Sequence, residues 1–156
     1  MSSAPPIHVA INGAACRMGR LLVALAAEDP NLKVAGAIEQ RGHVEIGQDA
    51  RVVAGLGAIC TLFTTDLPDG VNAVIDFSEP GGALAMVQAC HQRSVPLVLA
   101  TTGLSSQQEA TVHEAAASIP IVWAPSMSLA VNLVMKLSRL TARHLKDYAP
   151  GADVEI

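Results

Sequence analysis

The chain has 156 residues, a formal net charge of −4 and no cluster of lysine and arginine, which argues against nucleic acid as its main partner. Hydrophobic residues make up 51% of it, yet no apolar run is long enough to span a membrane, so we expect no membrane association. Cys16, Cys60 and Cys90 are scattered, and the five histidines lack ligand spacing. We therefore expect a cytoplasmic protein that binds no metal.

The N-terminal stretch predicts a strand, a tight glycine turn and a helix in immediate succession. Residues 7–12 form an apolar strand, and the apolar run after Gly19 supplies one face of a helix over residues 17–28. Gly13 allows the sharp turn, and Gly19 lets the helix pack closely on the strand. Because the N–H groups at a helix N-terminus lack intrahelical partners and the helix dipole favours an anion, this arrangement predicts a diphosphate site.

A second apolar strand, over residues 32–39, ends in Glu39, twenty positions after Gly19 (39 − 19). A carboxylate at this spacing accepts hydrogen bonds from both hydroxyls of an adenosine ribose and repels a 2′-phosphate. Glu39 therefore indicates NAD(H) as the cofactor. The alternative interpretation is a solvated acid at the end of an ordinary strand.

The remaining chain continues to alternate between strands and helices. Residues 40–58 contain four glycines, at positions 42, 47, 55 and 57, and predict an irregular segment with one helical turn near residues 50–54. Further strands are expected over residues 60–65, 71–77, 97–100 and 121–124. A helix is expected over residues 81–93, with Pro80 at its start. A second helix is expected to end at residue 118 and to begin at a capping box, formed either by Ser105 with Gln108 or by Ser106 with Glu109. A third is expected from residue 129 to about residue 148.

Alternating strands and helices predict right-handed parallel crossovers and therefore an α/β fold, a doubly wound parallel sheet of the Rossmann type. We expect a single dinucleotide-binding domain over residues 1–150, which includes the long last helix. In such sheets ligands bind beyond the carboxyl ends of the strands. The glycine turn, Glu39 and the segments after the later strands all fall at this edge, so they predict one shared site.

Four segments, in this order and spacing, resemble one enzyme family. They are Gly13-Ala14-Ala15-Cys16-Arg17-Met18-Gly19-Arg20, Asp76-Phe77-Ser78, Ala100-Thr101-Thr102-Gly103 and Ala124-Pro125-Ser126-Met127-Ser128. The family is 4-hydroxy-tetrahydrodipicolinate reductase, or dihydrodipicolinate reductase, of lysine biosynthesis in bacteria and plants, and the resemblance runs over the whole chain. It implies NAD(P)H-dependent reduction of the cyclic product of dihydrodipicolinate synthase to tetrahydrodipicolinate. It also implies a cytoplasmic homotetramer.

The resemblance assigns roles to particular residues. Those of the first turn would cradle the diphosphate: Gly13, Ala14, Ala15, Cys16, Arg17 and Met18. Glu39 would hold the adenosine ribose, and Phe77 would lie near the nicotinamide. Two further segments would flank the nicotinamide: Ala100, Thr101 and Thr102, and Ala124, Pro125, Ser126 and Met127. As alternatives, Phe77 is a core residue and the two threonine hydroxyls simply satisfy a turn.

The cofactor preference depends on the residues after Glu39. The family often has an arginine there that faces a 2′-phosphate, but this chain has Gln40, with Arg41 one position later. In an extended segment a shift of one residue points a side chain to the opposite face. We therefore expect NAD(H) to bind, with NADP(H) as the alternative. We expect no strong preference for the phosphorylated cofactor.

Four positions depart from the family's pattern. Cys16 replaces a glycine of the turn, Ala100 replaces the glycine before Thr-Thr-Gly, Ser126 replaces an asparagine and Ala130 replaces a glycine.

The family also continues, after a sequence like Val154-Glu155-Ile156, into a histidine-pair and lysine motif and a glycine-rich anion loop. These carry the general acid and bind the dicarboxylate substrate. We therefore expect residues 151–156 to begin a substrate-binding and oligomerisation domain that is missing here, with the catalytic residues beyond Ile156. By itself the chain is expected to bind cofactor without catalysing. The alternatives are a non-catalytic nucleotide-sensing module and the cofactor half of another NAD(P)-dependent oxidoreductase.

Overall fold

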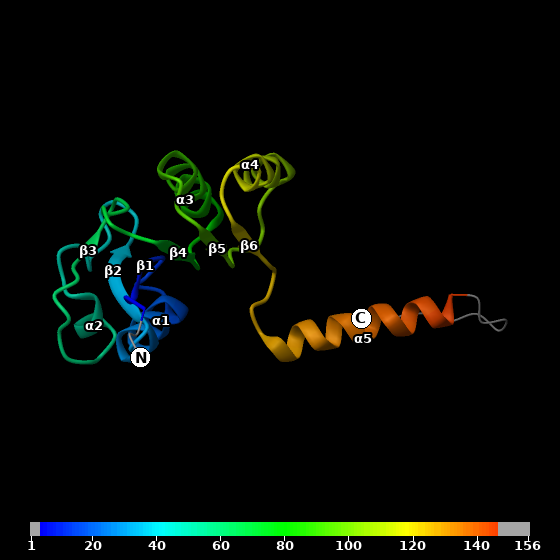
Figure 1. Cartoon of the computed structure of the whole chain (residues 1–156), viewed down its shortest axis with the longest axis horizontal. Coiled ribbons are helices and arrows are strands. Elements are labelled where there is room, and N and C mark those ends of the chain that lie inside the picture. The colour runs from blue at the N-terminus through cyan, green and yellow to red at the C-terminus, as the bar shows by residue number, and fades with distance from the viewer. Residues whose placement is uncertain (1–3, 147–156) are drawn as a thin grey trace. The chain divides into compact units, whose positions relative to one another are not determined.

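The structure, a computed structural model, describes residues 4–146. Packing divides the chain into two compact units, Met1–Trp123 and Ala124–Ile156. The first unit contains the whole sheet and four helices (Figure 1). The second contains one long helix. The predicted domain boundary at residues 150 and 151 lies outside the described residues and stays a prediction.

The first unit is built on a six-stranded parallel sheet with the strand order β3-β2-β1-β4-β5-β6. The strands are β1 Ile7–Asn12, β2 Leu32–Ile38, β3 Phe63–Thr64, β4 Ala73–Asp76, β5 Leu97–Leu99 and β6 Ile121–Trp123. The strand order reverses between β1 and β4: the strands that follow β1 are added on one side of it, and those that follow β4 are added on the opposite side. The predicted doubly wound α/β fold is confirmed, and the switch point is where such sheets bind their ligands.

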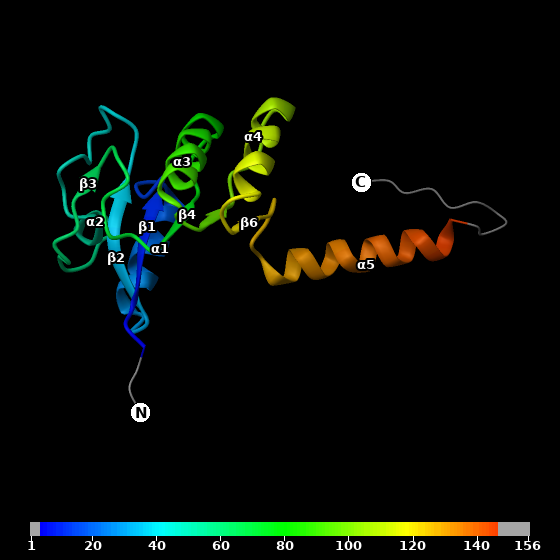
Figure 2. The ribbon, with the colours of Figure 1, turned by 45° about the horizontal axis from the view of Figure 1, so that its top comes forward.

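Helices cover both faces of this sheet. The helices α1 Arg17–Glu28 and α2 Ala50–Val53 lie on one side, and α3 Pro80–Arg93 and α4 Ser106–Ala116 lie on the other, as Figure 2 also shows. Side chains alternate accordingly along β1: Ile11 packs in a buried cluster with Val23 of α1, and Ala10 packs in another with Met86 of α3. Burial on both faces explains why these strands are almost wholly apolar.

Local sequence signals set the ends of several helices. Pro80 occupies the first turn of α3, where its missing N–H costs nothing. At α4 the structure selects one of the two possible capping boxes, in which Ser105 and Gln108 each accept a hydrogen bond from the other's backbone N–H. The helix α1 begins and ends at the predicted residues.

Several strands are shorter than expected. The strand predicted over residues 60–65 is reduced to Phe63–Thr64, and the strand predicted over residues 71–77 pairs only from Ala73 to Asp76. A strand extends only as far as it forms backbone hydrogen bonds with a neighbouring strand. β3 pairs with only two residues of β2. The predicted irregular segment after β2 contains a single helical turn, α2, as expected.

The second unit consists, among the described residues, of a short loop and α5 Leu129–Leu145. Ser128 caps this helix by accepting a hydrogen bond from the N–H of Val131. The predicted helix end near residue 148 lies outside the described residues, as does the strand-like pattern of residues 153–156. None of the helices within residues 4–146 is long and apolar enough to cross a membrane.

Candidate functional site

The turn between β1 and α1 is so tight that two positions accept only glycine. Gly13 has φ +74°, and a Cβ on it would lie 2.9 Å from the Cα of Ser78, which follows β4. A Cβ on Gly19 would lie 2.2 Å from the carbonyl oxygen of Gly13. The expected role of Gly13 is confirmed, whereas Gly19 packs on the turn, at Gly13 and Ala14, rather than on the strand as expected. The two glycines therefore let the backbone of the turn pack closely at this edge of the sheet.

The N-terminus of α1 offers free hydrogen-bond donors at this turn. Cys16 is the N-cap, and its Sγ accepts from the N–H of Gly19 at 3.2 Å. The N–H groups of Arg17 and Met18 have no acceptor among residues 4–146. Two unpaired N–H groups at the positive end of a helix dipole form a site suited to a phosphate or another anion.

Glu39 lies next to this turn rather than free in solvent. It directly follows β2, and its Oε1 accepts a 2.9 Å hydrogen bond from the N–H of Ala15 while Oε2 accepts from the N–H of Gln40 at 3.3 Å. A carboxylate thus stands beside the anion-binding N–H groups, the arrangement that a ribose next to a diphosphate requires. The contact with Ala15 thus holds the carboxylate against the turn.

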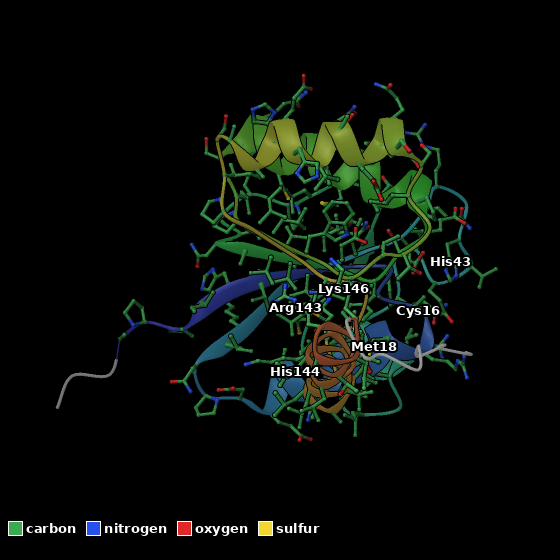
Figure 3. All side chains as sticks on the ribbon, turned by 90° about the vertical axis from the view of Figure 1, so that its right-hand side faces the viewer. Cys16, Met18, His43, Arg143, His144 and Lys146 are labelled. Atoms are coloured by element: carbon green, nitrogen blue, oxygen red, sulfur yellow. The ribbon has the colours of Figure 1, made fainter. Side chains whose placement is uncertain are left out.

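A cleft of about 670 Å³ opens at the carboxyl ends of β1, β2 and β4. Its walls come from the glycine turn, the end of β2, the segment after it, the end of β4 and the start of α3. They include Gly13, Ala15, Cys16, Glu39, Arg41, His43, Thr65, Phe77, Ser78 and Met86. Cys16 and His43, labelled in Figure 3, lie at the same side of this unit. The volume suits a small-molecule ligand.

The predicted site residues divide into groups. Gly13, Ala15, Cys16, Glu39 and Phe77 line the cleft, and Phe77 is only partly buried, so it is not a core residue. Ala14 is fully buried beneath the turn, and Arg17 and Met18 lie in the first turn of α1. Ala100, Thr101 and Thr102 follow β5 and are not among the residues that line the cleft. Ala124, Pro125, Ser126 and Met127 belong to the second unit.

The side chain of Thr101 is already engaged inside the protein. It is 4% exposed, and its hydroxyl lies 2.6 Å from Oδ1 of Asp76 and 3.0 Å from the carbonyl oxygen of Ser78. This supports the alternative interpretation, in which the hydroxyl satisfies the local structure. Thr102, in contrast, is exposed.

The assumption behind the expected orientation of Arg41 is wrong. The argument assumed an extended segment, but β2 ends at Ile38 and residues 41 and 42 form a turn. Strand alternation therefore does not apply, and Arg41 lines the same cleft as Glu39, together with His43. Neither side chain was predicted there, because a turn after a strand carries no periodic signal that places its side chains.

A buried polar network beneath the cleft was also missed. Asp76, at the end of β4, is fully buried, and its carboxylate accepts hydrogen bonds from Nδ2 of Asn12 at 2.5 Å and from the N–H of Ser78 at 3.1 Å. Thr101 is the third partner. The available signal was a polar residue at the end of each of two apolar strands, Asn12 and Asp76. The network joins β1, β4 and the segment after β5 at the point where the strand order reverses.

Cys90 of α3 is packed close to this network. Burial, and secondarily the charge of Asp76, raise the pKa of the Cys90 thiol to about 12, although Arg93 acts in the opposite direction. The thiol is therefore un-ionised at neutral pH. Within the described part of the chain, no group of three or more His, Cys, Asp or Glu side chains is arranged to hold a metal ion.

Comparison with known proteins agrees with this geometry. Residues 7–127 match the family model described as dihydrodipicolinate reductase, N-terminus. The 4-hydroxy-tetrahydrodipicolinate reductase of Rhodopirellula baltica is 48% identical over 159 residues, which cover 99% of this chain and 57% of that protein. The enzymes of Bordetella parapertussis and Burkholderia multivorans are each 40% identical, over 100% and 96% of this chain and 57% and 56% of their own lengths.

The chain thus spans a little over half the length of these relatives. The matched residues include the glycine turn, Glu39 and the strand ends that form the cleft. The chain belongs to the dihydrodipicolinate reductase family, of which it carries the N-terminal domain.

Proposed function

We propose that this chain is the cofactor-binding part of a 4-hydroxy-tetrahydrodipicolinate reductase, which transfers a hydride from NADH or NADPH to the cyclic dipicolinate-pathway intermediate. The observation that carries the proposal is the pairing of two free N–H groups, at Arg17 and Met18, with the neighbouring carboxylate of Glu39. A nicotinamide dinucleotide, when bound, supplies the hydride. The chain's residues bind and orient it.

In this proposal the parts of the cleft have separate tasks. The N–H groups of Arg17 and Met18 bind the diphosphate, and Gly13 allows it to approach the backbone closely. Glu39 accepts hydrogen bonds from the ribose hydroxyls through lone pairs that the N–H groups of Ala15 and Gln40 leave free. Phe77, partly exposed in the cleft, packs against the apolar part of the ligand. The proposed flanking of the nicotinamide by residues 100–102 and 124–127 rests on the family resemblance.

The proposed cofactor is NAD(H), with NADP(H) also accepted. Glu39 favours a ribose with two free hydroxyls, whereas the cations of the neighbouring Arg41 and, when protonated, His43 favour a 2′-phosphate. These opposing effects lead us to expect that NADPH binds no more than about tenfold more tightly than NADH, a difference of ~1.4 kcal/mol. Isothermal titration calorimetry with both cofactors measures the ratio, and Arg41→Ala should lower NADPH affinity while it leaves NADH affinity nearly unchanged.

Reduction also requires a bound dicarboxylate and a proton donor close to the nicotinamide. Among residues 4–146, the cleft contains Arg41 and His43 as basic groups but no set able to hold two carboxylates as well as a 2′-phosphate. We therefore propose that these groups come from outside this segment, and that the 156-residue chain binds cofactor without turnover. A cytoplasmic homotetramer remains our proposal for the complete enzyme.

The test is an NADH-oxidation assay with freshly generated pathway substrate, on this chain and on a chimera that continues it with the remaining sequence of the Rhodopirellula baltica relative. Cofactor binding by both proteins and turnover by the chimera alone is the expected result. Turnover by the 156-residue chain would overturn the proposal that the substrate-binding and proton-donating groups come from outside this segment. Binding without turnover by either protein would favour a nucleotide-sensing module or another NAD(P)-dependent reductase.

A further inference from the structure

The segment between β2 and α2 forms one wall of the cleft but is weakly attached to the fold. Residues 40–46 are joined to one another by turns, such as His43 N–H to the carbonyl oxygen of Gln40 at 3.1 Å. Val44 is 83% exposed, and Ile46 is exposed as well. Firm attachment begins only at Gly47, whose N–H donates to the carbonyl oxygen of Phe63. Yet Arg41 and His43, which line the cleft, lie in the weakly attached part.

One side chain from another element holds this part in place. Glu45 forms an ion pair with Arg20 of α1, with 3.3 Å between Oε1 and Nη2. Among the described residues, this is the one side-chain hydrogen bond or ion pair that links residues 41–46 to a helix or strand of the fold. The Arg20–Glu45 ion pair therefore connects this wall of the cleft to α1.

The same arginine also contacts the glycine turn. Its Nε donates to the carbonyl oxygen of Ala15 at 2.8 Å, and its Nη1 donates to the carbonyl oxygen of Val53 at 3.3 Å. The N–H of Ala15 is at the same time bonded to Glu39. Ala15 is thus held on one side by the proposed ribose-binding carboxylate and on the other by Arg20, so the guanidinium joins the turn to the wall.

We propose that Arg20 is a positioning residue for the adenosine half of the cofactor. It fixes residues 40–46 against the diphosphate turn, and so sets the position of Arg41 and His43 relative to Glu39. This inference rests on the proposed function, because it assumes that the cleft receives an adenosine diphosphate moiety. Arg20 acts through Ala15 and Glu45 and touches no ligand itself.

We expect the ion pair to affect the position of residues 40–46 more than the stability of the whole protein. The side chain of Arg20 is 42% exposed and that of Glu45 is 17% exposed, so solvent screens the pair in part and we expect it to contribute about 1 kcal/mol or less to the free energy of unfolding. Its loss should release a segment that has few other contacts, while the sheet and the helices stay folded. A change in ligand affinity without a comparable change in stability is therefore the expected signature.

The test compares Glu45→Gln with Glu28→Gln in the full 156-residue chain. Glu28 pairs with Arg51 at the other end of α1, so the control removes an equivalent charge without touching the cleft. In the free protein, amide hydrogen exchange of residues 40–46 should accelerate in Glu45→Gln and not in Glu28→Gln, with α4 unchanged in both. ADP-ribose affinity should fall about fivefold in Glu45→Gln alone, the equivalent of ~1 kcal/mol.

A double variant separates positioning from general damage. If Arg20 acts through Glu45, adding Glu45→Gln to Arg20→Gln should cost nothing beyond the loss caused by Arg20→Gln alone. Unchanged exchange of residues 40–46 in Glu45→Gln, or equal losses of affinity in the two glutamate variants, would overturn the inference. Failure of the wild-type chain to bind ADP-ribose would instead overturn the proposed function, because hydrogen exchange tests the ion pair without any ligand.

Discussion

The hydroxyl of Thr101 donates a 2.6 Å hydrogen bond to the carboxylate of Asp76, and both side chains are buried at the carboxyl ends of neighbouring strands. The bond joins two segments 25 positions apart in the sequence. Removing the hydroxyl leaves a buried carboxylate short of one donor, which is more costly than the loss of an ordinary exposed hydrogen bond.

Thr101→Val should therefore lower the free energy of unfolding by about 1–3 kcal/mol. The exposed neighbour offers a matched control, since Thr102→Val should change stability by less than about 0.5 kcal/mol. Urea denaturation followed by circular dichroism measures both values. Equal effects of the two substitutions would show that Asp76 does not depend on Thr101.

Gly13 combines a left-handed backbone with a crowded environment, and Gly70 allows the two effects to be separated. Gly70 has φ +75°, close to the +74° of Gly13, but an added Cβ on it would meet nothing within 4 Å. Gly70→Ala should cost only the left-handed strain, about 1–2 kcal/mol. Gly13→Ala should cost about 1–3 kcal/mol more from overpacking against Ser78, and it should abolish NADH binding. Equal stability of the two variants would contradict the close contact seen at the turn.

The three cysteines should differ in reactivity. Cys16 and Cys60 are exposed, whereas Cys90 is buried with its pKa raised to about 12. Since the thiolate is the reactive form, a disulfide reagent at pH 8 should modify two thiols in the native protein and the third only after unfolding. NADH should slow the modification of Cys16, which lines the cleft, and leave that of Cys60 unchanged. Equal protection of both cysteines would speak against binding at the turn.

The side chain of Cys16 stands where a diphosphate approaches the backbone. Cys16→Gly removes the sulfur and should tighten NADH binding, and the lost cap on Gly19 should cost little because glycine is a tolerated N-cap residue. Cys60→Gly is the control, since Cys60 has φ +60° and lies outside the set of residues that line the cleft. Fluorescence titration measures both affinities. Unchanged NADH affinity in Cys16→Gly would mean that the turn accommodates the cysteine.

Asp49 should make stability depend on pH in the acidic range. Burial raises the pKa of its carboxyl, but the N–H groups of Val52, Arg51, Ile59 and Cys60 outweigh burial and hold the pKa below 3.8. A lowered folded-state pKa gives stability that is fully present above the unfolded value and lost as the pH falls through the folded one. The free energies of unfolding of the wild type and of Asp49→Asn should therefore approach each other as the pH falls from 5 to about 2.5. The exposed Glu114→Gln should show no such convergence.

The sequence by itself determined the elements whose cause is local. The apolar runs and breakers around residues 7–39 predicted β1, α1 and β2 closely, and the spacing from Gly19 to Glu39 predicted a carboxylate beside the turn. The doubly wound fold class followed from the alternation of strands and helices, whereas the strand order came from the structure. These features are readable because periodicity, capping and turn chemistry act between residues a few positions apart.

Only the tertiary structure decided which side chains meet at the site. Asn12 and Asp76 are 64 positions apart and Arg20 and Glu45 are 25 apart, and no local pattern links either pair. The same holds for Arg41, whose place in the cleft depends on the turn after Ile38 rather than on strand alternation. A parallel sheet brings distant strand ends to one edge, so contacts at that edge depend on the packing of the whole sheet.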